Sequence, residues 1–326
     1  MANRGIAVDL GTSKITVCSN YNGRVKRFQL YGLSEDYPCC VYYNNNVLYG
    51  EDARLKGQKD PEYCFKHLKT LLGRFYSDEV VQRMKDLVSY KIVPGENDHV
   101  MVKVCENDQI ICKSPCELLS MLLNHVIEFV KRSMENEQID YLALAYPPSF
   151  TDNQKRELKR IGILTGIRHI SLYAETTAAC IIYGISYIAP GQTVMVVDCG
   201  AGTCDATILQ YDNDFKVVRH AGLSTVGGDS YTQVLMEHLL KFSKKDTTIE
   251  RMTSMKRAKL EDVAENAKIA LRSQDIFDID IKGFSPVVLT EKILSHLYKD
   301  LNKKICDTVK PEILCQKSGN GKFCHK

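Results

Sequence analysis

The chain has 326 residues, of which 44% are hydrophobic and 25% are charged. This is the composition of a globular protein long enough for two substantial cores, so we expect two domains. A formal net charge of +3 is too small to indicate nucleic-acid binding, and no apolar core of signal-peptide length follows a basic start. We therefore expect a cytoplasmic protein that binds neither nucleic acid nor a membrane.

Thirteen cysteines are many for this length, but no two of them have the C-x-x-C spacing. We expect reduced, partly buried thiols rather than a disulfide framework. The C-terminal trio Cys315, Cys324 and His325 is a weak zinc candidate, because structural zinc takes four ligands that come in pairs.

The first half of the chain alternates strand and helix signals. β-Branched and aromatic residues predict strands over 4–20, 23–31, 38–43, 140–147 and 168–173. Apolar residues at helical spacing, or capping boxes, predict helices over 62–73, 114–134, 151–166 and 175–184. The helix at 151–166 lies between two strands of the buried type, which predicts a parallel strand, helix, strand crossover.

The segment Ala-Pro-Gly-Gln at 189–192 separates this half from a second one. The pattern of the second half predicts antiparallel strands at 193–198, 205–211 and 215–221. It then predicts a helix over 256–272, a strand over 277–282 and a last helix over 290–309. We place one lobe at 1–188, a second at 189–310, and a tail without regular structure at 311–326.

One motif occurs twice. Both "IAVDLGTSKITV" (6–17) and "MVVDCGAGTCDATI" (195–208) are an apolar strand, an aspartate, one residue, a glycine, and small residues before a second strand. The second copy fits neither G-x-G-x-x-G nor G-x-x-x-x-G-K-[ST], so it is neither a dinucleotide fingerprint nor a P-loop. The repetition favours two related lobes with one such turn each.

The residue types in these turns suit a metal-chelated polyphosphate. Gly11, Gly200 and Gly202 let main-chain N–H groups approach phosphate oxygens, and Thr12, Ser13 and Thr203 add hydroxyl donors. Asp9 and Asp198 would be repelled by phosphate, but they can hold a hydrated Mg²⁺. A single turn of this kind is commonly only a strand end, whereas two copies together with Gly227, Gly228 and Asp229 favour a ligand site.

At these residues the chain resembles the actin-like ATPases and, within them, the seventy-kilodalton heat-shock chaperones of the DnaK type. The resemblance rests on "AVDLGTSK", "VVDCGAGTCDATIL", "GGDSY" and the segment from Tyr146 to Gly184, and it extends over residues 4 to about 309. It implies an α/β fold of two lobes, each built on a ribonuclease-H-like mixed β-sheet flanked by helices, with the second lobe incomplete at its C-terminus. It also implies Mg-ATP or ADP in the cleft between the lobes, with K⁺ as a further candidate ion.

The resemblance implies roles for individual residues. It places Asp9, Asp198 and Asp205 at the metal, the associated ions and the attacking water, with Glu175 as base or water anchor and Lys69 against the γ-phosphate. From periodicity alone, Lys69 is equally well explained as a solvated helix lysine. Glu175 is also explained as an N-cap or first-turn carboxylate of the following helix, a role that is compatible with the catalytic one. The cofactor-binding set is Asp9, Gly11, Thr12, Ser13, Lys14, Gly200, Ala201, Gly202, Thr203, Gly227, Gly228, Asp229, Glu265, Lys268 and Arg272.

Several positions depart from the family pattern. Ala201 replaces the middle glycine of the second turn, Lys14 replaces an aromatic residue, and Thr176 replaces the proline after Glu175. Ile269 stands where a family arginine packs on the base, so we expect weaker base binding, in part offset by Arg272. The family's peptide-binding domain has no counterpart, so we expect no client folding by this chain alone.

Three functions follow as hypotheses. The first is a chaperone-type ATPase domain with slow or impaired hydrolysis of ATP to ADP and phosphate. The second is a non-catalytic nucleotide-lobe protein that binds co-chaperones, such as J-domain proteins and nucleotide-exchange factors, or full-length relatives. The third is an actin-like or sugar-kinase-type phosphotransferase, for which no sugar-binding acidic pair is visible in the sequence.

Overall fold

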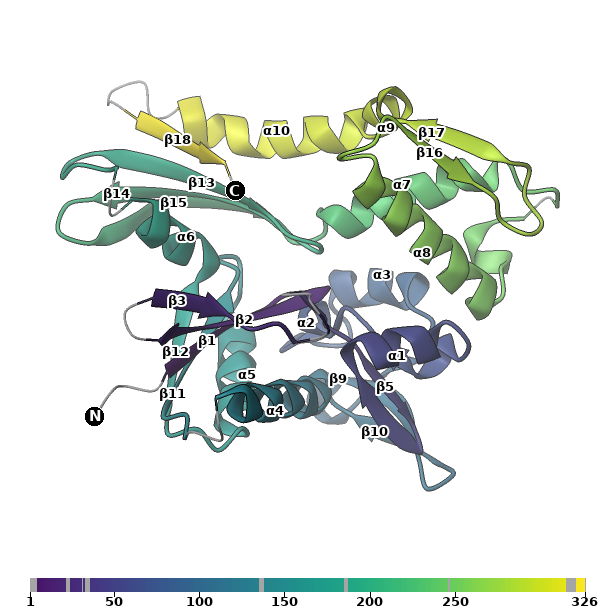
Figure 1. The fold of residues 1–326 in the computed structure, drawn as a ribbon, viewed down its shortest axis with the longest axis horizontal. Helices are drawn as coiled ribbons and strands as arrows, with labels where there is room; N and C mark the ends of the chain where they lie inside the picture. Colours follow the sequence, from purple (N-terminus) through teal and green to yellow (C-terminus); the bar gives the residue numbers. More distant parts are fainter. Residues whose placement is uncertain are drawn as a thin grey trace.

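The computed structural model describes residues 5–21, 24–30, 32, 36–134, 138–184, 187–245, 247–314 and 321–325. The first half of the chain, purple to teal in Figure 1, forms the lower part of the molecule, and the second half, teal to yellow, forms the upper part. This mixed α/β architecture of sheets flanked by helices is the predicted fold class.

The first sheet has the strand order β12-β11-β1-β2-β3, with β4 beside β2. Its strands are β1 (Gly5–Leu10), β2 (Lys14–Tyr21), β3 (Arg24–Arg27), β4 (Tyr37–Pro38), β11 (Tyr141–Tyr146) and β12 (His169–Ala174). Strands β1 and β2 are antiparallel, whereas β11 runs parallel to both β1 and β12. Helix α5 (Asp152–Ile163) connects β11 to β12, so the predicted parallel crossover is confirmed.

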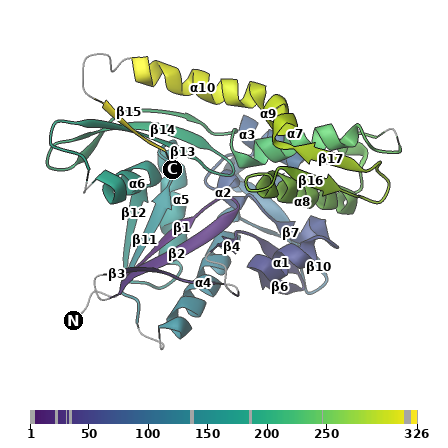
Figure 2. The same cartoon turned by 45° about the horizontal axis from the view of Figure 1, so that its top comes forward.

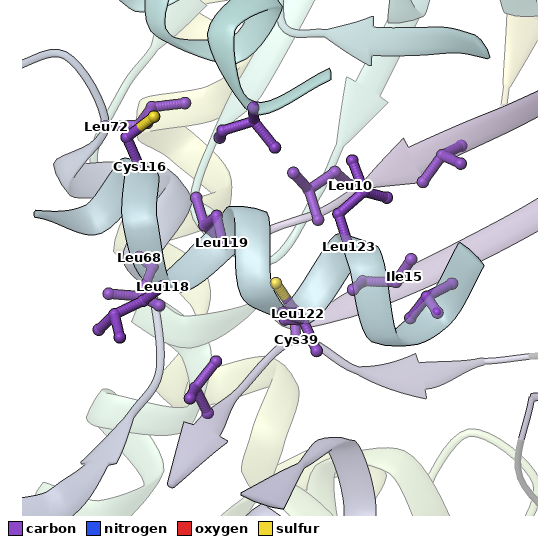
Figure 3. Packing of buried hydrophobic residues seen from close by; sticks show 14 of the residues in the cluster. Leu10, Ile15, Cys39, Leu68, Leu72, Cys116, Leu118, Leu119, Leu122 and Leu123 are labelled. Atoms are coloured by element: carbon purple, nitrogen blue, oxygen red, sulfur yellow. The ribbon is translucent and has the colours of Figure 1, made fainter. Parts of the chain in front are cut away.

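Helix α4 (Pro115–Ser133) packs its apolar face against this sheet. Ser114 and Glu117 form the predicted capping box at its N-terminus. Leu118, Leu119, Leu122 and Leu123 are fully buried with strand residues such as Leu10 and Ile15 (Figure 3). Burial of one leucine side chain contributes about 1.5–3 kcal/mol, so this face fixes the sheet that carries the first glycine turn.

A second sheet has the order β10-β9-β5-β6, with β7 beside β5 and β8 beside β9. The elements of this region are β5 (Val41–Asn44), β6 (Asn46–Tyr49), α1 (Gly50–Gly57), η1 (Pro61–Tyr63), β7 (Cys64–Phe65), α2 (Leu68–Leu71), α3 (Glu79–Leu87), β8 (Ile92–Pro94), η2 (Glu96–Asp98), β9 (Val100–Glu106) and β10 (Gln109–Lys113). The predicted helix over 62–73 is wrong. Pairing of β7 with β5 and a left-handed backbone at His67 (φ 57°) interrupt it, so Lys69 lies on the single turn α2.

The third sheet has the order β15-β14-β13-β18. Its strands are β13 (Thr193–Cys199), β14 (Cys204–Tyr211), β15 (Phe215–Leu223) and β18 (Gly321–His325). The antiparallel β13, β14, β15 order is as predicted. Helix α6 (Glu175–Gly184) follows β12, but its Cys180 packs with Val194 and Val196 of β13, so the two halves share this helix.

The expectation of a tail without regular structure is wrong for part of the tail. Helix α10 (Lys299–Leu314) continues beyond residue 310, and β18 pairs in parallel with β13. Backbone pairing along the edge of β13 produces this strand, and the lysine-rich and glycine-rich local sequence gives no signal for it. Residues 315–320, including Cys315, and the side chains of Cys324 and His325 are outside the described part, and so is the zinc candidate they form.

The remaining elements form a helical layer beside the third sheet (Figure 2). They are α7 (Gly228–Leu240), η3 (Ile249–Arg251), α8 (Ser254–Ala270), β16 (Ile276–Ile279), β17 (Val287–Thr290) and α9 (Glu291–Leu297). Helix α10 then runs back over the third sheet, where it contacts β14 and β15 (Figure 1). Leu235, Leu239, Leu260 and Ala264 form the centre of its own apolar core. Helix α8 therefore presents its other face toward the first half of the chain, where Figure 1 shows it beside α1.

Candidate functional site

The two glycine motifs form the same hairpin. In the first, Gly11 N donates to the Lys14 carbonyl at 2.9 Å, and in the second, Gly200 N donates to the Thr203 carbonyl at 2.9 Å. Each aspartate belongs to the second strand pair from its loop, because Asp9 pairs with Thr16 and Asp198 pairs with Asp205. The repeat seen in the sequence is therefore a repeat of backbone geometry.

The two turns face each other. A Cβ atom added to Gly202 would lie 3.1 Å from Thr12 Oγ1 and 3.4 Å from Thr70 Oγ1. A cleft of about 880 Å³ opens beside this contact, and its walls include Thr12, Ser13, Lys14, Ala201, Gly202, Asp229 and Glu265. A smaller cavity of about 30 Å³ shares Thr12 and Thr70 with the cleft and is lined further by Lys69 and Thr203.

A buried ion pair lies next to the turns. Lys69 Nζ is 2.8 Å from Glu175 Oε1, and the Lys69 residue is 3% exposed. Burial raises the pKa of Glu175, the Lys69 ammonium opposes this, and the carboxylates of Asp9 and Asp198 raise the pKa further. Three carboxylates therefore lie within electrostatic reach of one ammonium, and the excess negative charge suits a divalent cation.

The carboxylates near the two turns fit a metal ion that is coordinated partly by the phosphate oxygens of a bound molecule. Among the described residues, no group of three or more histidine, cysteine, aspartate or glutamate side chains could hold an ion alone. Mg²⁺ usually takes one or two protein carboxylates and completes its shell with phosphate oxygens and water. Asp9 and Asp198 match that requirement, because each carboxylate lies one residue before the end of its strand, next to its turn.

Asp205 has a partner that sequence reasoning missed. His220 Nε2 lies 3.0 Å from Asp205 Oδ1, and the Asp205 side chain is 2% exposed. Gly222 makes room for this pair, since a Cβ there would lie 2.5 Å from Asp205 Oδ1. The pairing of β14 with β15 brings residues 205 and 220 to one face of the sheet, which only the register reveals. Any metal bound at Asp205 would share its carboxylate with His220.

The Gly227-Gly228-Asp229 turn supports the second hairpin. Gly228 N donates to the Gly200 carbonyl at 2.9 Å, and Asp229 N donates to the Ala201 carbonyl at 2.8 Å. The hairpin carbonyls accept the hydrogen bonds of these two N–H groups, so Gly228 and Asp229 hold the second hairpin in place through their backbone. The glycine at 227 is explained by close approach, since a Cβ there would lie 2.4 Å from Ala201 O.

Helix α8 supplies the other predicted residues. Lys268 Nζ lies 2.6 Å from Glu265 Oε2 and donates to the Gly228 carbonyl at 2.9 Å and to Thr232 Oγ1 at 2.8 Å. Glu265 and Ile269 line the cleft, and Ile269 is 47% exposed. Arg272 follows helix α8 and lines neither cavity. The other predicted residues that line neither cavity are Asp9, Gly11, Glu175, Asp198, Gly200, Asp205, Gly227, Gly228 and Lys268.

A family model described as Hsp70 protein matches residues 5–316. The chain belongs to the Hsp70 family. It contains an Hsp70 nucleotide-binding domain, and members of this family bind ATP and ADP. Within the described ranges, no helix of this Hsp70 chain is both long and apolar enough to cross a membrane.

A set of polar contacts joins the two halves of this Hsp70 domain across the cleft. His67 Nδ1 lies 3.1 Å from Asp229 Oδ2, Lys66 Nζ lies 3.6 Å from Glu261 Oε1, and Arg54 Nη1 lies 3.3 Å from Asp262 Oδ2. All six residues line the cleft. Apart from Asp229, the sequence analysis missed these residues, because each is an ordinary surface charge until the fold brings α7 and α8 beside α1 and α2.

The His67 contact should make part of the stability of this Hsp70 domain depend on pH. Burial lowers the pKa of His67, but the neighbouring Asp229 and Glu261 carboxylates outweigh burial and the Lys66 charge, so the pKa lies above its usual value. A raised pKa stabilises the folded state below the unfolded pKa of about 6.5, and this contribution is lost as pH rises through the folded pKa.

Urea denaturation at about pH 6 and pH 8 tests this, because the two values lie on either side of the unfolded pKa. We expect the free energy of unfolding of wild type to fall more across this range than that of His67→Asn. Asparagine tolerates the left-handed backbone at position 67 but carries no charge. Equal pH dependence of the two proteins would contradict the assignment.

Proposed function

We propose that this chain binds Mg-ATP between its two hairpin turns and hydrolyses it slowly to ADP and phosphate. The observation that carries the proposal is the buried Lys69–Glu175 pair, which lies in reach of Asp9 and Asp198 beside two facing glycine turns. Positive charge at a transferring phosphoryl group and a base near the attacking water are the two requirements of this reaction.

Each proposed role follows from the position of the side chain. Lys69 is buried and lines the same small cavity as Thr203, and the ammonium of a buried lysine would stabilise a phosphoryl group strongly. Glu175 accepts a proton or orients water, and its raised pKa makes a bound proton less costly than on an ordinary glutamate. Bound Mg²⁺ would neutralise phosphate charge, and Asp9 and Asp198 would orient its water shell.

The turn residues would then position the phosphates. Thr12, Ser13 and Thr203 offer hydroxyl groups, and Thr12 lies where the two turns meet. The Ala201 carbonyl accepts a hydrogen bond from Asp229 N, so the extra methyl group of Ala201 belongs to a turn that α7 already holds in place. We attribute the proposed slow turnover to this methyl group, which reduces the room for adjustment around a phosphate.

The nucleoside would lie against α8, and a substitution on this helix should tighten nucleotide binding. Ile269 lines the cleft and is half exposed, where the family resemblance implies an arginine that packs on the base. We expect Ile269→Arg to lower the Kd for Mg-ATP about fivefold, because a planar guanidinium stacks on a base. Calorimetric titration of both proteins measures the change.

The control for that variant is Ile269→Lys, which adds the same charge without the planar group. An equal gain in both variants would show attraction of the phosphates by charge rather than stacking on the base. Titration with Mg-triphosphate, which has no base, should give no gain for Ile269→Arg.

Calorimetry with Mg-ATP and Mg-ADP, combined with a phosphate-release assay, tests the proposed function. We expect wild type to bind both nucleotides and to release phosphate, and Asp198→Ala to lose the Mg²⁺-dependent part of the affinity. Binding without phosphate release would support a non-catalytic protein that acts on co-chaperones or full-length relatives. Transfer to an added sugar would support a phosphotransferase, and absence of heat with either nucleotide would overturn nucleotide binding.

A further inference from the structure

Two thiols face each other at the base of the second hairpin turn. Cys199 ends β13, Cys204 begins β14, and the two residues are directly opposite in register with their Sγ atoms 2.8 Å apart. The hydrogen bond from Gly200 N to the Thr203 carbonyl makes Gly200 and Thr203 a hydrogen-bonded pair. Cys199 and Cys204 are therefore the next, non-hydrogen-bonded pair, in which opposite side chains lie closest.

The corresponding pair of the first hairpin consists of residues that serve only in packing. There the corresponding residues are Leu10 and Ile15, which pair in the same register and are both 0% exposed. The second hairpin replaces two aliphatic side chains with two thiols. Cys199 is exposed and Cys204 is buried, so only one sulfur can be reached from solvent.

We propose that Cys199 and Cys204 form a reversible redox modification site, which closes to a disulfide across the base of the phosphate-binding turn when the protein meets a peroxide. The S–S bond is about 2.05 Å long, so the sulfurs move by less than about 1 Å from their present positions. The strands are already paired on both sides, and the bond closes without a change of register.

The reaction is balanced with hydrogen peroxide as the oxidant. The Cys199 sulfur attacks one peroxide oxygen, the O–O bond breaks, and the products are Cys199 sulfenic acid and one water. The Cys204 sulfur then attacks the Cys199 sulfur, the S–O bond breaks, and a second water leaves with the Cys204 proton. Two thiols lose two protons and two electrons, and the peroxide is reduced to two molecules of water.

Other cysteines of the chain provide internal controls. Cys40 and Cys64 also lie close together, but both are buried, and Cys40 Sγ lies 3.1 Å from the Gly50 carbonyl oxygen. Their burial should make both react with peroxide more slowly than Cys199 in the folded protein. Cys112 and Cys306 are exposed, so they report oxidation that depends on exposure alone.

The test uses the full chain, hydrogen peroxide and a thiol-alkylating reagent added afterwards. A protease that cuts before aspartate releases residues 198–204, which hold Cys199 and Cys204 and no other cysteine. We expect this peptide to be two hydrogen atoms lighter and unalkylated after peroxide, and alkylated twice if dithiothreitol is added first. Peptides with Cys40 and Cys64 should remain alkylated.

A single substitution distinguishes a disulfide from simple oxidation. In Cys204→Ser, we expect Cys199 to accumulate as a sulfenic acid that reacts with dimedone, because the second thiol is absent. Alkylation of both thiols of the 198–204 peptide at peroxide doses that oxidise Cys112 would overturn the proposal, as would a bond from Cys199 to Cys306. None of these measurements uses nucleotide, so they are independent of the proposed ATPase activity.

Discussion

Replacing Lys69 with methionine should reduce phosphate release from ATP by about 100-fold to 1,000-fold, the usual cost of removing one preorganised group that stabilises developing charge. Methionine keeps the length of the side chain and fills the buried site, where Lys69 is 3% exposed. The variant also leaves Glu175 without its partner at 2.8 Å, so we expect a loss of stability of about 3–5 kcal/mol.

The two effects separate in the double variant Lys69→Met/Glu175→Gln. Glutamine removes the unpaired carboxylate, so we expect urea denaturation to show a recovery of stability relative to Lys69→Met alone. Phosphate release should remain low, because the ammonium and the proposed base are both absent. Recovery of both stability and phosphate release would show that Lys69 only neutralises Glu175 and has no role at the phosphate.

Replacing Gly227 with alanine should destabilise the domain by about 1–3 kcal/mol, the usual range for overpacking. The added Cβ would lie 2.4 Å from Ala201 O and 2.8 Å from Gly200 O, and both are backbone atoms that cannot rotate away. The turn must shift, and the two hydrogen bonds that α7 donates to the second hairpin must lengthen. Urea denaturation measures the loss of stability, and calorimetry measures the accompanying loss of nucleotide affinity.

Gly228→Ala is the matched control. Its Cβ would lie 3.4 Å from Lys268 Nζ and 3.6 Å from Ala201 Cα, which is ordinary contact. Alanine is also the better helix residue at the start of α7, so we expect stability close to that of wild type. Equal destabilisation by the two substitutions would contradict the close-approach explanation for Gly227.

The sequence predicts most of the fold and the two hairpins because their signals are local. The aspartate and glycine motifs, the capping boxes at Ser114 and Thr151, and the crossover between β11 and β12 all depend on residues near one another in the chain. Family resemblance adds Lys69 and Glu175, which periodicity does not select. The structure places these two side chains in contact.

The missed features depend on pairing between distant segments. The helix predicted over 62–73 fails because Phe65 pairs with Val41 of β5, which no window around residue 65 contains. His220 becomes the partner of Asp205 only through the register of β14 and β15. The contacts of Arg54 and Lys66 with α8, and of His67 with α7, likewise need the tertiary arrangement.

Two backbone hydrogen bonds couple the position of α7 to the position of the second turn. Because Gly228 and Asp229 donate to the hairpin carbonyls, the 13 residues of α7 cannot tilt independently of that turn. At about 1.5 Å per residue this arm is roughly 20 Å long, so a small displacement at the turn becomes a larger one at its far end near Leu240. A small shift of the second hairpin turn would thereby become a larger movement of the helical layer to which α7 belongs.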